Sequence, residues 1–408
     1  MSVTPLSGIR VVDLTTMVVG PACTVRLSGY GADVIKIESF DGDQMRALGG
    51  PSPTGQHSGS YLQLNRGKRA VSLNLKQPAC REIMARLLDR CDVLVSNMRP
   101  DALRRLGLDA ESVRADRPRV VHCMITGFGP GGPYRGRPAY DSALQGASGF
   151  GGLFARRDGA PKYVPMLICD HVVGEITAGA IIAALYERER TGVGAAIEVP
   201  MHETMSAFVL QEHLGPMSFE PALGPLGDAR VLNADNRPLR TADGWISITA
   251  NTDAQTRAFL QAIGRGEAID DPRFRTTADR IRHIEAWFAL RAEALKGRTT
   301  AEWLDLFGRC DVPALPCHSL ETLLDDPHLT AVELVETVAH PTEGTIRGLR
   351  PTVLSGGRSG GAGRVAGPVG WDTRAVLDEL GYHPDAIEDL IAAGAALCAA
   401  PPQEDARP

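Results

Sequence analysis

The chain of 408 residues is 43% hydrophobic and carries a formal net charge of −6. This length and apolar share suit two domains, or one large domain with an insertion, and exclude disordered and fibrous proteins. The acidic balance argues against general nucleic-acid binding. We also expect a soluble, cytoplasmic protein, because no signal peptide is visible at the N-terminus and no apolar run approaches the roughly 20 residues that span a bilayer.

The first 130 residues alternate apolar runs with helical stretches. Helices are predicted at residues 21–30, 78–90 and 100–105, and runs typical of buried strands cover residues 9–14, 32–38, 70–75, 92–96 and 119–125. Strand–helix–strand units joined by short turns predict a parallel α/β sheet. Ligands bind beyond the carboxyl ends of such strands. We therefore expect binding groups in the segments that follow them, at residues 15–20, 39–44, 76, 97–99 and 126–141.

An apolar helix is predicted from residue 172 to about residue 190, with Asp170 at its start. Its residues are apolar or small almost all round, which is typical of a helix buried in a large core. A charged last turn and a left-handed cap at Gly192 end it. Asp170 has two interpretations. It is a helix N-cap, or it is a nucleophilic carboxylate that accepts an acyl group and that the helix N-terminus keeps ionised.

The second half of the chain changes pattern after a stretch rich in Pro, Gly and polar residues. A strand at residues 245–249 and helices at 253–263, 281–296 and 299–309 predict a smaller α+β domain. The expected parts, in chain order, are a large domain over residues 1–214, a linker over 215–240, the small α+β domain over 241–330, a second linker over 331–345, a C-terminal part over 346–400 that returns to the large domain, and a disordered tail over 401–408.

Several features that suggest chemistry have simpler explanations. The G-x-G-x-x-G motif at residues 127–132 leads into Pro and Gly rather than a helix, so we expect a turn instead of a dinucleotide site. The G-x-S-x-G motif at residues 357–361 lies in a Gly-rich run, so we expect a loop. The eight cysteines form no C-x-x-C pair, which is typical of a reduced protein, and the apolar-flanked Cys169 is expected in the core. The histidines show no metal-binding spacing, so no metal site is expected, and His171 is either a polar neighbour of Asp170 or a solvent-facing side chain.

Short motifs occur along nearly the whole chain in one order: PLSGIRVVDL at residues 5–14, GADVIKIE at 31–38, NRGKRAVSLNLK at 65–76, DVLVSN at 92–97, TGFG at 126–129, RERTG at 188–192, RTADGW at 240–245 and DVPALP at 311–316. In this order they resemble the class III acyl-CoA transferases, the CaiB/BaiF family that includes formyl-CoA transferase. The resemblance implies a Rossmann-like parallel large domain, a smaller second domain, and a homodimer whose two chains are interlocked as linked rings.

The resemblance also implies an activity and a set of site residues. CoA moves from an acyl-CoA to a free carboxylic acid, with CoA as substrate and no cofactor. The family's acyl-accepting aspartate falls on Asp170, which forms first a mixed anhydride and then aspartyl-CoA. Lys76 and Arg105 suit the phosphates of CoA, although each is equally an ordinary solvated charge. The family's contacts with CoA fall on Thr16, Met17, Val18, Val19, Leu73, Lys76, Asn97, Met98, Arg105 and Met201, and the substrate pocket on Tyr140 and Asp141.

Three departures from formyl-CoA transferase bear on the choice of acid. Val18 and Ser39 replace a glutamine and an arginine, and residues 250–255 lack the glycine-rich loop of that enzyme. We therefore expect a larger acid or a dicarboxylic acid rather than oxalate or formate.

Two rival functions stay open. The α-methylacyl-CoA racemases share this fold, but their catalytic histidine falls on Tyr140, and a phenol is a poor base at neutral pH. A non-catalytic CoA-binding protein would leave Asp170 with capping as its only task.

Overall fold

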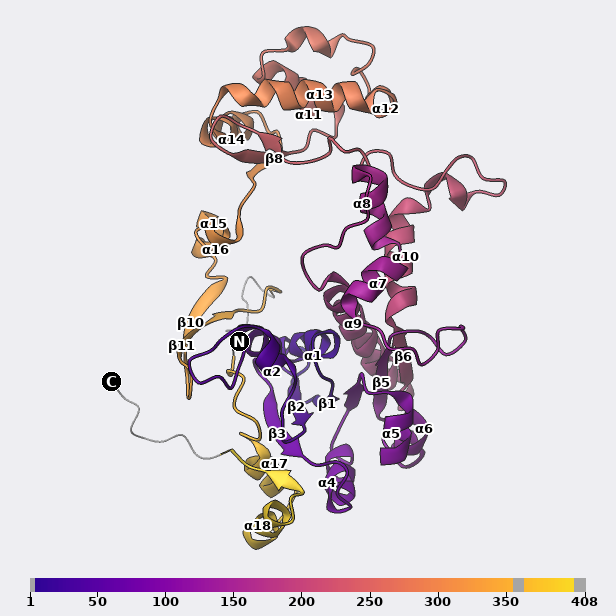
Figure 1. Ribbon diagram of the computed structural model, residues 1–408, viewed down its shortest axis with the longest axis vertical. Coiled ribbons are helices and arrows are strands. Elements are labelled where there is room, and N and C mark those ends of the chain that lie inside the picture. Colours follow the sequence, from indigo (N-terminus) through magenta and orange to yellow (C-terminus); the bar gives the residue numbers. More distant parts are fainter. Residues whose placement is uncertain (1–3, 355–362, 400–408) are drawn as a thin grey trace. The chain divides into compact units, whose positions relative to one another are not determined.

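The chain forms two compact units (Figure 1). The computed structural model describes residues 4–354 and 363–399. The first unit comprises Met1–Ser148, Tyr163–Ala207 and Leu329–Pro408, and the second comprises Gly149–Lys162 and Phe208–His328.

The G-x-S-x-G motif at residues 357–361 and the tail at 401–408 lie outside the described residues. The division into domains and linkers that the sequence suggests stays a prediction. Residues 335–349 form a hairpin of β10 (Val335–His340) and β11 (Gly344–Leu349) within the first unit.

The first unit is built on a seven-stranded sheet. The spatial order is β12-β3-β2-β1-β4-β5-β6, and every pair is parallel except β12 with β3. The prediction of an α/β protein with a large parallel sheet is confirmed, although the sequence did not predict β6 or β12. The strands are β1 (Arg10–Leu14), β2 (Asp33–Glu38), β3 (Arg69–Leu73), β4 (Val93–Ser96), β5 (Val121–Thr126), β6 (Ala196–Pro200) and β12 (Ala396–Leu397).

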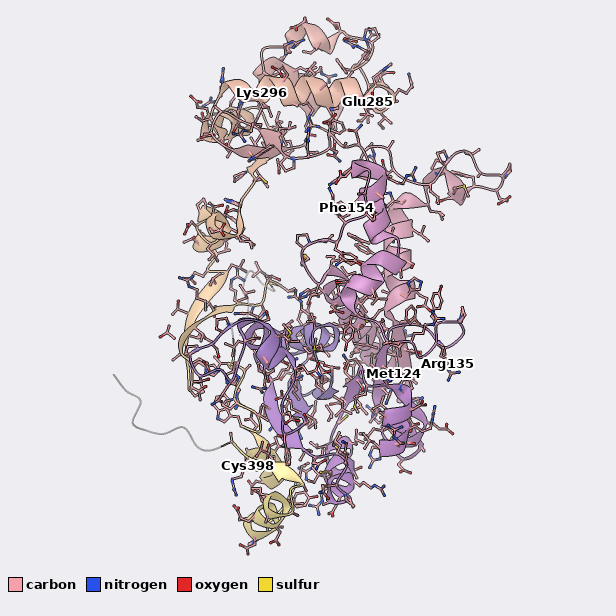
Figure 2. All side chains as sticks on the ribbon, viewed as in Figure 1. Met124, Arg135, Phe154, Glu285, Lys296 and Cys398 are labelled. Carbon is pink, nitrogen blue, oxygen red and sulfur yellow. The ribbon has the colours of Figure 1, made fainter. Side chains whose placement is uncertain are left out.

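Helices bury apolar side chains of these strands, as a parallel sheet requires. Val12, Leu14, Ile35 and Leu94 share one buried cluster with residues of several helices, and Met124 of β5, labelled in Figure 2, packs against this cluster. The helices of this cluster are α4 (Ala79–Leu88), α5 (Pro100–Leu106), α6 (Ala110–Asp116), α17 (Thr373–Glu379) and α18 (Pro384–Ala392). The helices α1 (Val19–Gly29) and α9 (Ile168–Thr191) pack against each other and against strands of the sheet.

The chain reverses its direction across the sheet at β1. From β1 it builds outward through β2 to β3, and it then returns to β4 on the other side of β1 and continues to β5 and β6. The loops that follow β1 and β4 therefore diverge at their carboxyl ends. This is the position where open α/β sheets bind ligands.

The predicted apolar helix is confirmed as α9, a helix of 24 residues that ends at the left-handed Gly192. It begins at Ile168, before Asp170, and only one side of it is buried in this chain: Ile176 and Tyr186 are 43% and 67% exposed. The expectation of an all-round buried helix is therefore wrong for the single chain. By length and composition alone, α9 is the one helix among the described residues that would suffice to cross a membrane, and core helices of soluble proteins pass the same test.

The second unit combines a small antiparallel sheet, ordered β7-β8-β9, with helices around an aromatic core of Phe259, Trp287, Trp303 and Phe307. Its elements are α8 (Phe150–Asp158), η1 (Gly215–Ser218), β7 (Leu239–Arg240), β8 (Trp245–Ile248), α11 (Asp253–Ala262), η2 (Gly266–Ile269), α12 (Thr277–Arg282), α13 (Ile284–Ala294), η3 (Leu295–Gly297), α14 (Thr300–Arg309), β9 (Ala314–Pro316) and α15 (Leu320–Leu323). The remaining helices are α2 (Met45–Leu48), α3 (Gly59–Asn65) and α7 (Asp141–Ala147) in the first unit, and α10 (Met201–His213) and α16 (Pro327–Ala331) where the chain passes between units.

Candidate active site

The loops that follow β1 and β4 are joined by a side chain. The Thr16 amide donates to Asn97 Oδ1 at 3.0 Å, and Asn97 Nδ2 donates to the Thr16 carbonyl at 2.9 Å. Asn97 thus binds both the amide and the carbonyl of Thr16 and fixes the backbone there. Two residues that the resemblance assigns to CoA binding therefore meet at the expected edge of the sheet.

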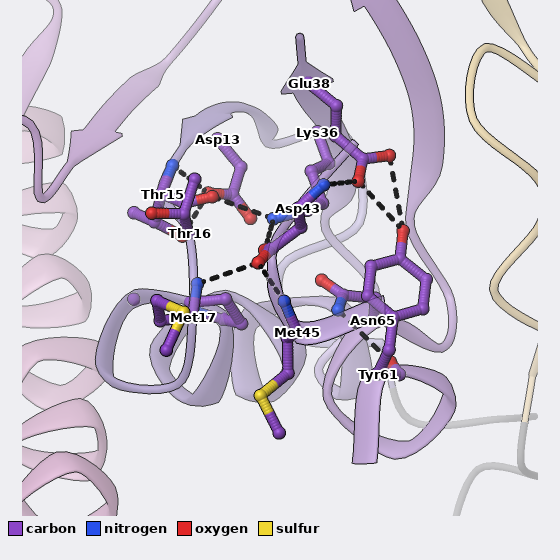
Figure 3. Close-up of polar contacts among 12 residues, drawn as sticks. Asp13, Thr15, Thr16, Met17, Lys36, Glu38, Asp43, Met45, Tyr61 and Asn65 are labelled. Atoms are coloured by element: carbon purple, nitrogen blue, oxygen red, sulfur yellow. Dashed lines mark hydrogen bonds and ion pairs between the residues drawn. The ribbon is translucent and has the colours of Figure 1, made fainter. Parts of the chain in front are cut away.

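Met17, the next residue of this loop, has an unusual backbone conformation. Its φ is 67°, in the left-handed region that a side chain as large as methionine rarely adopts. Its amide donates to the Asp43 carboxylate, as Figure 3 shows. Strained backbone of this kind is often found at functional sites.

Asp170 is the third residue of α9 rather than its N-cap. The N-cap is Leu167, which makes no side-chain cap. The first-turn amides of Cys169 and Asp170 instead donate to Asp141 Oδ1, at 2.7 and 3.2 Å. The capping interpretation of Asp170 is wrong, because a carboxylate from α7 already satisfies those donors.

Asp141 is itself held in place. It is 3% exposed, and Gln145 Nε2, one turn along α7, donates to Asp141 Oδ2 at 2.7 Å. Gln145 also accepts from the Val164 amide at 2.9 Å and donates to the Met166 carbonyl at 3.1 Å. These contacts fix the segment that leads into α9, and so they fix the position of Asp170.

The carboxylate of Asp170 is half-buried, and it has no hydrogen-bond partner among the residues that the structure describes. Burial, and next the nearby charge of Asp141, raise its pKa to about 7. This shift is opposite in direction to the one expected from the helix N-terminus alone. Burial raises the pKa of the neighbouring Cys169 thiol to about 12, which agrees with the prediction that Cys169 is a core residue.

The helix α9 packs closely on the start of α1 at Gly174, one helical turn after Asp170. A Cβ atom at Gly174 would lie 2.8 Å from the Val19 carbonyl oxygen and 2.8 Å from Ala22 Cβ, so only glycine allows this approach of α9 to α1. Residues 170 and 174 share one face of the helix, with Cβ positions about 5–6 Å apart. The carboxylate therefore belongs to the same region as the loop after β1.

The other predicted site residues differ in how far they are exposed. Met98 is half-buried after β4, whereas Val18, Val19 and Met201 are buried. Leu73, at the end of β3, is 1% exposed, so any contact with a ligand would use its backbone. Lys76, Arg105 and Tyr140 are exposed, the last at 69% immediately before Asp141.

Residues 127–132 form bends and turns rather than a helix, as predicted, and the Gly129 amide donates to Glu203. His171 is half-buried. Within residues 4–354 and 363–399, no group of three His, Cys, Asp or Glu side chains is placed to hold a metal ion.

Four charged residues near the loop were missed by the sequence analysis. Asp13, Lys36, Asp43 and Lys68 are all buried beneath it. A signal was present, because Asp13 and Lys36 interrupt otherwise apolar strand sequences at positions where a buried strand carries apolar residues.

Comparison with known proteins identifies the family. A sequence model described as CoA-transferase family III matches residues 6–373. The chain belongs to CoA-transferase family III. The resemblance inferred from the motifs is thereby confirmed.

Relatives of known sequence and of known structure match nearly the whole chain. A succinate–glutarate CoA-transferase from Agrobacterium fabrum is 34% identical over 361 residues, covering 86% of this chain and 89% of that protein. A crystal structure of Rv3272 from Mycobacterium tuberculosis has a TM-score of 0.79 at 26% identity, covering 92% of this chain and 100% of that one. A CaiB/BaiF family protein from Brucella suis has a TM-score of 0.76 at 30% identity, covering 92% and 99%.

Proposed function

We propose that this family III protein transfers CoA from an acyl-CoA to a free carboxylic acid through covalent intermediates on Asp170. The proposal rests on one observation, that two neighbouring aspartates have different roles. Asp141 caps α9, and this leaves the Asp170 carboxylate unbonded on a rigid helix beside the loop after β1. A carboxylate without partners, fixed in position, is suited to nucleophilic attack.

The proposed reaction begins with attack of the Asp170 carboxylate on the thioester carbonyl. The carbon–sulfur bond breaks, CoA leaves as a thiolate, and an aspartyl mixed anhydride forms. The thiolate then attacks the Asp170 carbonyl carbon, which releases the donor acid and leaves aspartyl-CoA. The acceptor carboxylate attacks the Asp170 carbonyl of aspartyl-CoA, which releases CoA as a thiolate and forms a second mixed anhydride. The thiolate then attacks the acyl carbonyl of this anhydride, so that a new acyl-CoA departs and the Asp170 carboxylate is regenerated.

This route needs no other cofactor, because one thioester replaces another at nearly equal free energy. The protein must position the thioester and exclude water from the activated intermediates. We assign the substrate pocket to Tyr140 and Asp141, and CoA contacts to Thr16, Met17, Val18, Val19, Leu73, Lys76, Asn97, Met98, Arg105 and Met201.

We further propose that the acid is dicarboxylic or larger than oxalate. Val18, Ser39 and the glycine-free stretch at residues 250–255 depart from formyl-CoA transferase in the direction of a different acid. The Agrobacterium relative is named for succinate and glutarate, two dicarboxylates, which supports the same choice. We also propose that the enzyme is a cytoplasmic, interlocked homodimer.

The test compares Asp170→Asn with a matched control on the same helix, Glu175→Gln, whose exposed carboxylate pairs with Arg26. Turnover of succinyl-CoA, acetyl-CoA and oxalyl-CoA donors against a panel of acids is measured. We expect Asp170→Asn to bind CoA but to lose transfer by about a thousandfold or more, and Glu175→Gln to stay within about twofold of wild type. Wild-type turnover in Asp170→Asn would refute the mechanism, and α-deuterium gain in heavy water would favour a racemase.

A further inference from the structure

The loop at residues 15–18 rests on a buried cluster of four charges. Asp13, Lys36, Asp43 and Lys68 are 0–2% exposed. Lys36 Nζ lies 2.9 Å from Asp43 Oδ2, and Lys68 Nζ lies 3.3 Å from Asp13 Oδ2. Buried ion pairs contribute little net stability, because both charges lose their hydration. A gain in stability therefore does not explain why these four charges are buried.

Three members of the cluster bind the backbone of the loop, as Figure 3 shows. Asp13 Oδ1 accepts from the Thr15 amide at 2.8 Å, and Lys36 Nζ donates to the Thr15 carbonyl at 2.8 Å. Asp43 Oδ1 accepts from the Met17 amide at 3.0 Å. With Asn97 holding Thr16 from the side, successive backbone groups from Thr15 to Met17 each have a fixed partner.

Asp43 is the member that acts on the strained residue. Its Oδ1 accepts from the amides of Met17 and Met45, both at 3.0 Å, so one oxygen joins the loop to the start of α2. A φ of 67° is sterically unfavourable for a methionine. The hydrogen bond from the Met17 amide to the buried Asp43 carboxylate stabilises this conformation. The surroundings of the loop thus determine its shape.

The charges of the cluster support one another. Burial alone would lower the pKa of Lys36, but the carboxylates of Asp13, Asp43 and Glu38 outweigh burial and raise that pKa. Burial raises the pKa of Asp13, and the opposing ammonium groups of Lys68 and Lys36 bring it below its usual value. Both shifts favour the charged forms of Lys36 and Asp13.

We propose that Asp43, supported by Lys36, is a positioning residue that holds the Met17 amide, and with it residues 15–18, in the shape that receives the acyl-CoA thioester. This inference rests on the proposed function, because it gives a task to a loop assigned to CoA. A loop ordered before the acyl-CoA binds keeps the thioester in line for attack by Asp170.

The test uses a matched pair of double variants, Lys36→Met/Asp43→Asn and Lys36→Met/Asp43→Ala. Both remove the same two charges, but only asparagine keeps an oxygen that accepts from the Met17 amide. Single-turnover release of CoA from succinyl-CoA is measured together with the Kd of free CoA. We expect the alanine variant to be at least about tenfold slower than the asparagine variant, with CoA affinities within about threefold of each other.

The outcomes separate positioning from simple loss of structure. Equal rates in the two double variants, or rates that fall only in proportion to the folded fraction, would overturn the proposal. Hydrogen exchange of the Met17 amide in the wild-type enzyme gives a second test that needs no variant: slow exchange before ligand binding is expected, and exchange at the rate of a free loop would contradict it. Wild-type enzyme that forms no adduct on Asp170 would instead refute the proposed function and leave the exchange result intact.

Discussion

At the scale of single residues, the arrangement of Asp141 and Asp170 separates two tasks that the sequence could not separate. An aspartate at the start of a helix usually serves as its cap. Here the cap comes from Asp141, 29 positions earlier in the chain, so Asp170 is left without a structural partner. The same carboxylate of Asp141 lies close enough to raise the pKa of Asp170, after burial, to about 7.

The raised pKa predicts how activity depends on pH. Attack requires ionised Asp170, so the rate of the first half-reaction should rise with pH, with a midpoint near 7. Asp141→Asn removes the neighbouring negative charge but keeps an oxygen for the helix amides, so the midpoint should move to lower pH. The check is the pH dependence of single-turnover CoA release. Glu175→Gln, which changes a charge farther along α9, should leave the midpoint in place, and an unchanged or raised midpoint in Asp141→Asn would contradict the assignment.

At the scale of elements, the packing of α9 on α1 positions the site. The small residues in α9 predict close approach to a neighbour, and that much follows from sequence. Which glycine makes the contact does not follow, because it depends on how two helices far apart in sequence cross. Gly174 abuts Val19 and Ala22, whereas a Cβ at Gly179 would meet nothing within 4 Å.

The two glycines give a matched prediction. Gly174→Ala should destabilise the protein by about 1–3 kcal/mol, because its methyl group would collide with the backbone of α1. Gly179→Ala should be neutral or stabilising by roughly 0.5–1 kcal/mol, because alanine favours the helix and space is open. Urea unfolding of both variants provides the measurement. Equal effects would show that the close approach at Gly174 is not needed for stability.

The strands β1 to β5 and the helices α1, α4 and α5 could be predicted because apolar runs and turn residues repeat along the first 130 residues, whereas the short helices α2, α3 and α6 were not predicted. The strand β12 could not be predicted, since two residues carry no periodic signal, and β6 was obscured by its half-exposed pattern. The contacts around the site could not be predicted from the sequence either. Asp43, Lys36 and Asp13 come from separate segments and act on one loop only after the sheet is assembled.

At the scale of the whole molecule, a single chain leaves large apolar side chains in contact with solvent. Ile176 and Tyr186 of α9 are exposed in the first unit, and Phe219 and Leu223, at 57% and 73%, in the second. Where such side chains adjoin, they form the kind of apolar patch that binds another chain. The proposed interlocked homodimer would provide such a chain.

Interlocking predicts an assembly that dilution does not separate, because the chains cannot part without substantial unfolding. Sedimentation velocity from micromolar to nanomolar protein should therefore show a dimer throughout. Size-exclusion chromatography in mild denaturant serves as the control, in which dissociation and loss of secondary structure should coincide. A folded, active monomer of 43.6 kDa at nanomolar concentration would refute interlocking and leave the chemistry of Asp170 untouched.

The central claim is that Asp170 carries the acyl group and then CoA, and trapping tests it most directly. The wild-type enzyme is mixed with succinyl-CoA in the absence of an acceptor acid, treated with hydroxylamine and digested for mass spectrometry. The account predicts a hydroxamate on the peptide that contains Asp170, formed at the rate of CoA transfer and absent in Asp170→Asn. Continued transfer with no modification of Asp170, or with the modification on another residue, would contradict it.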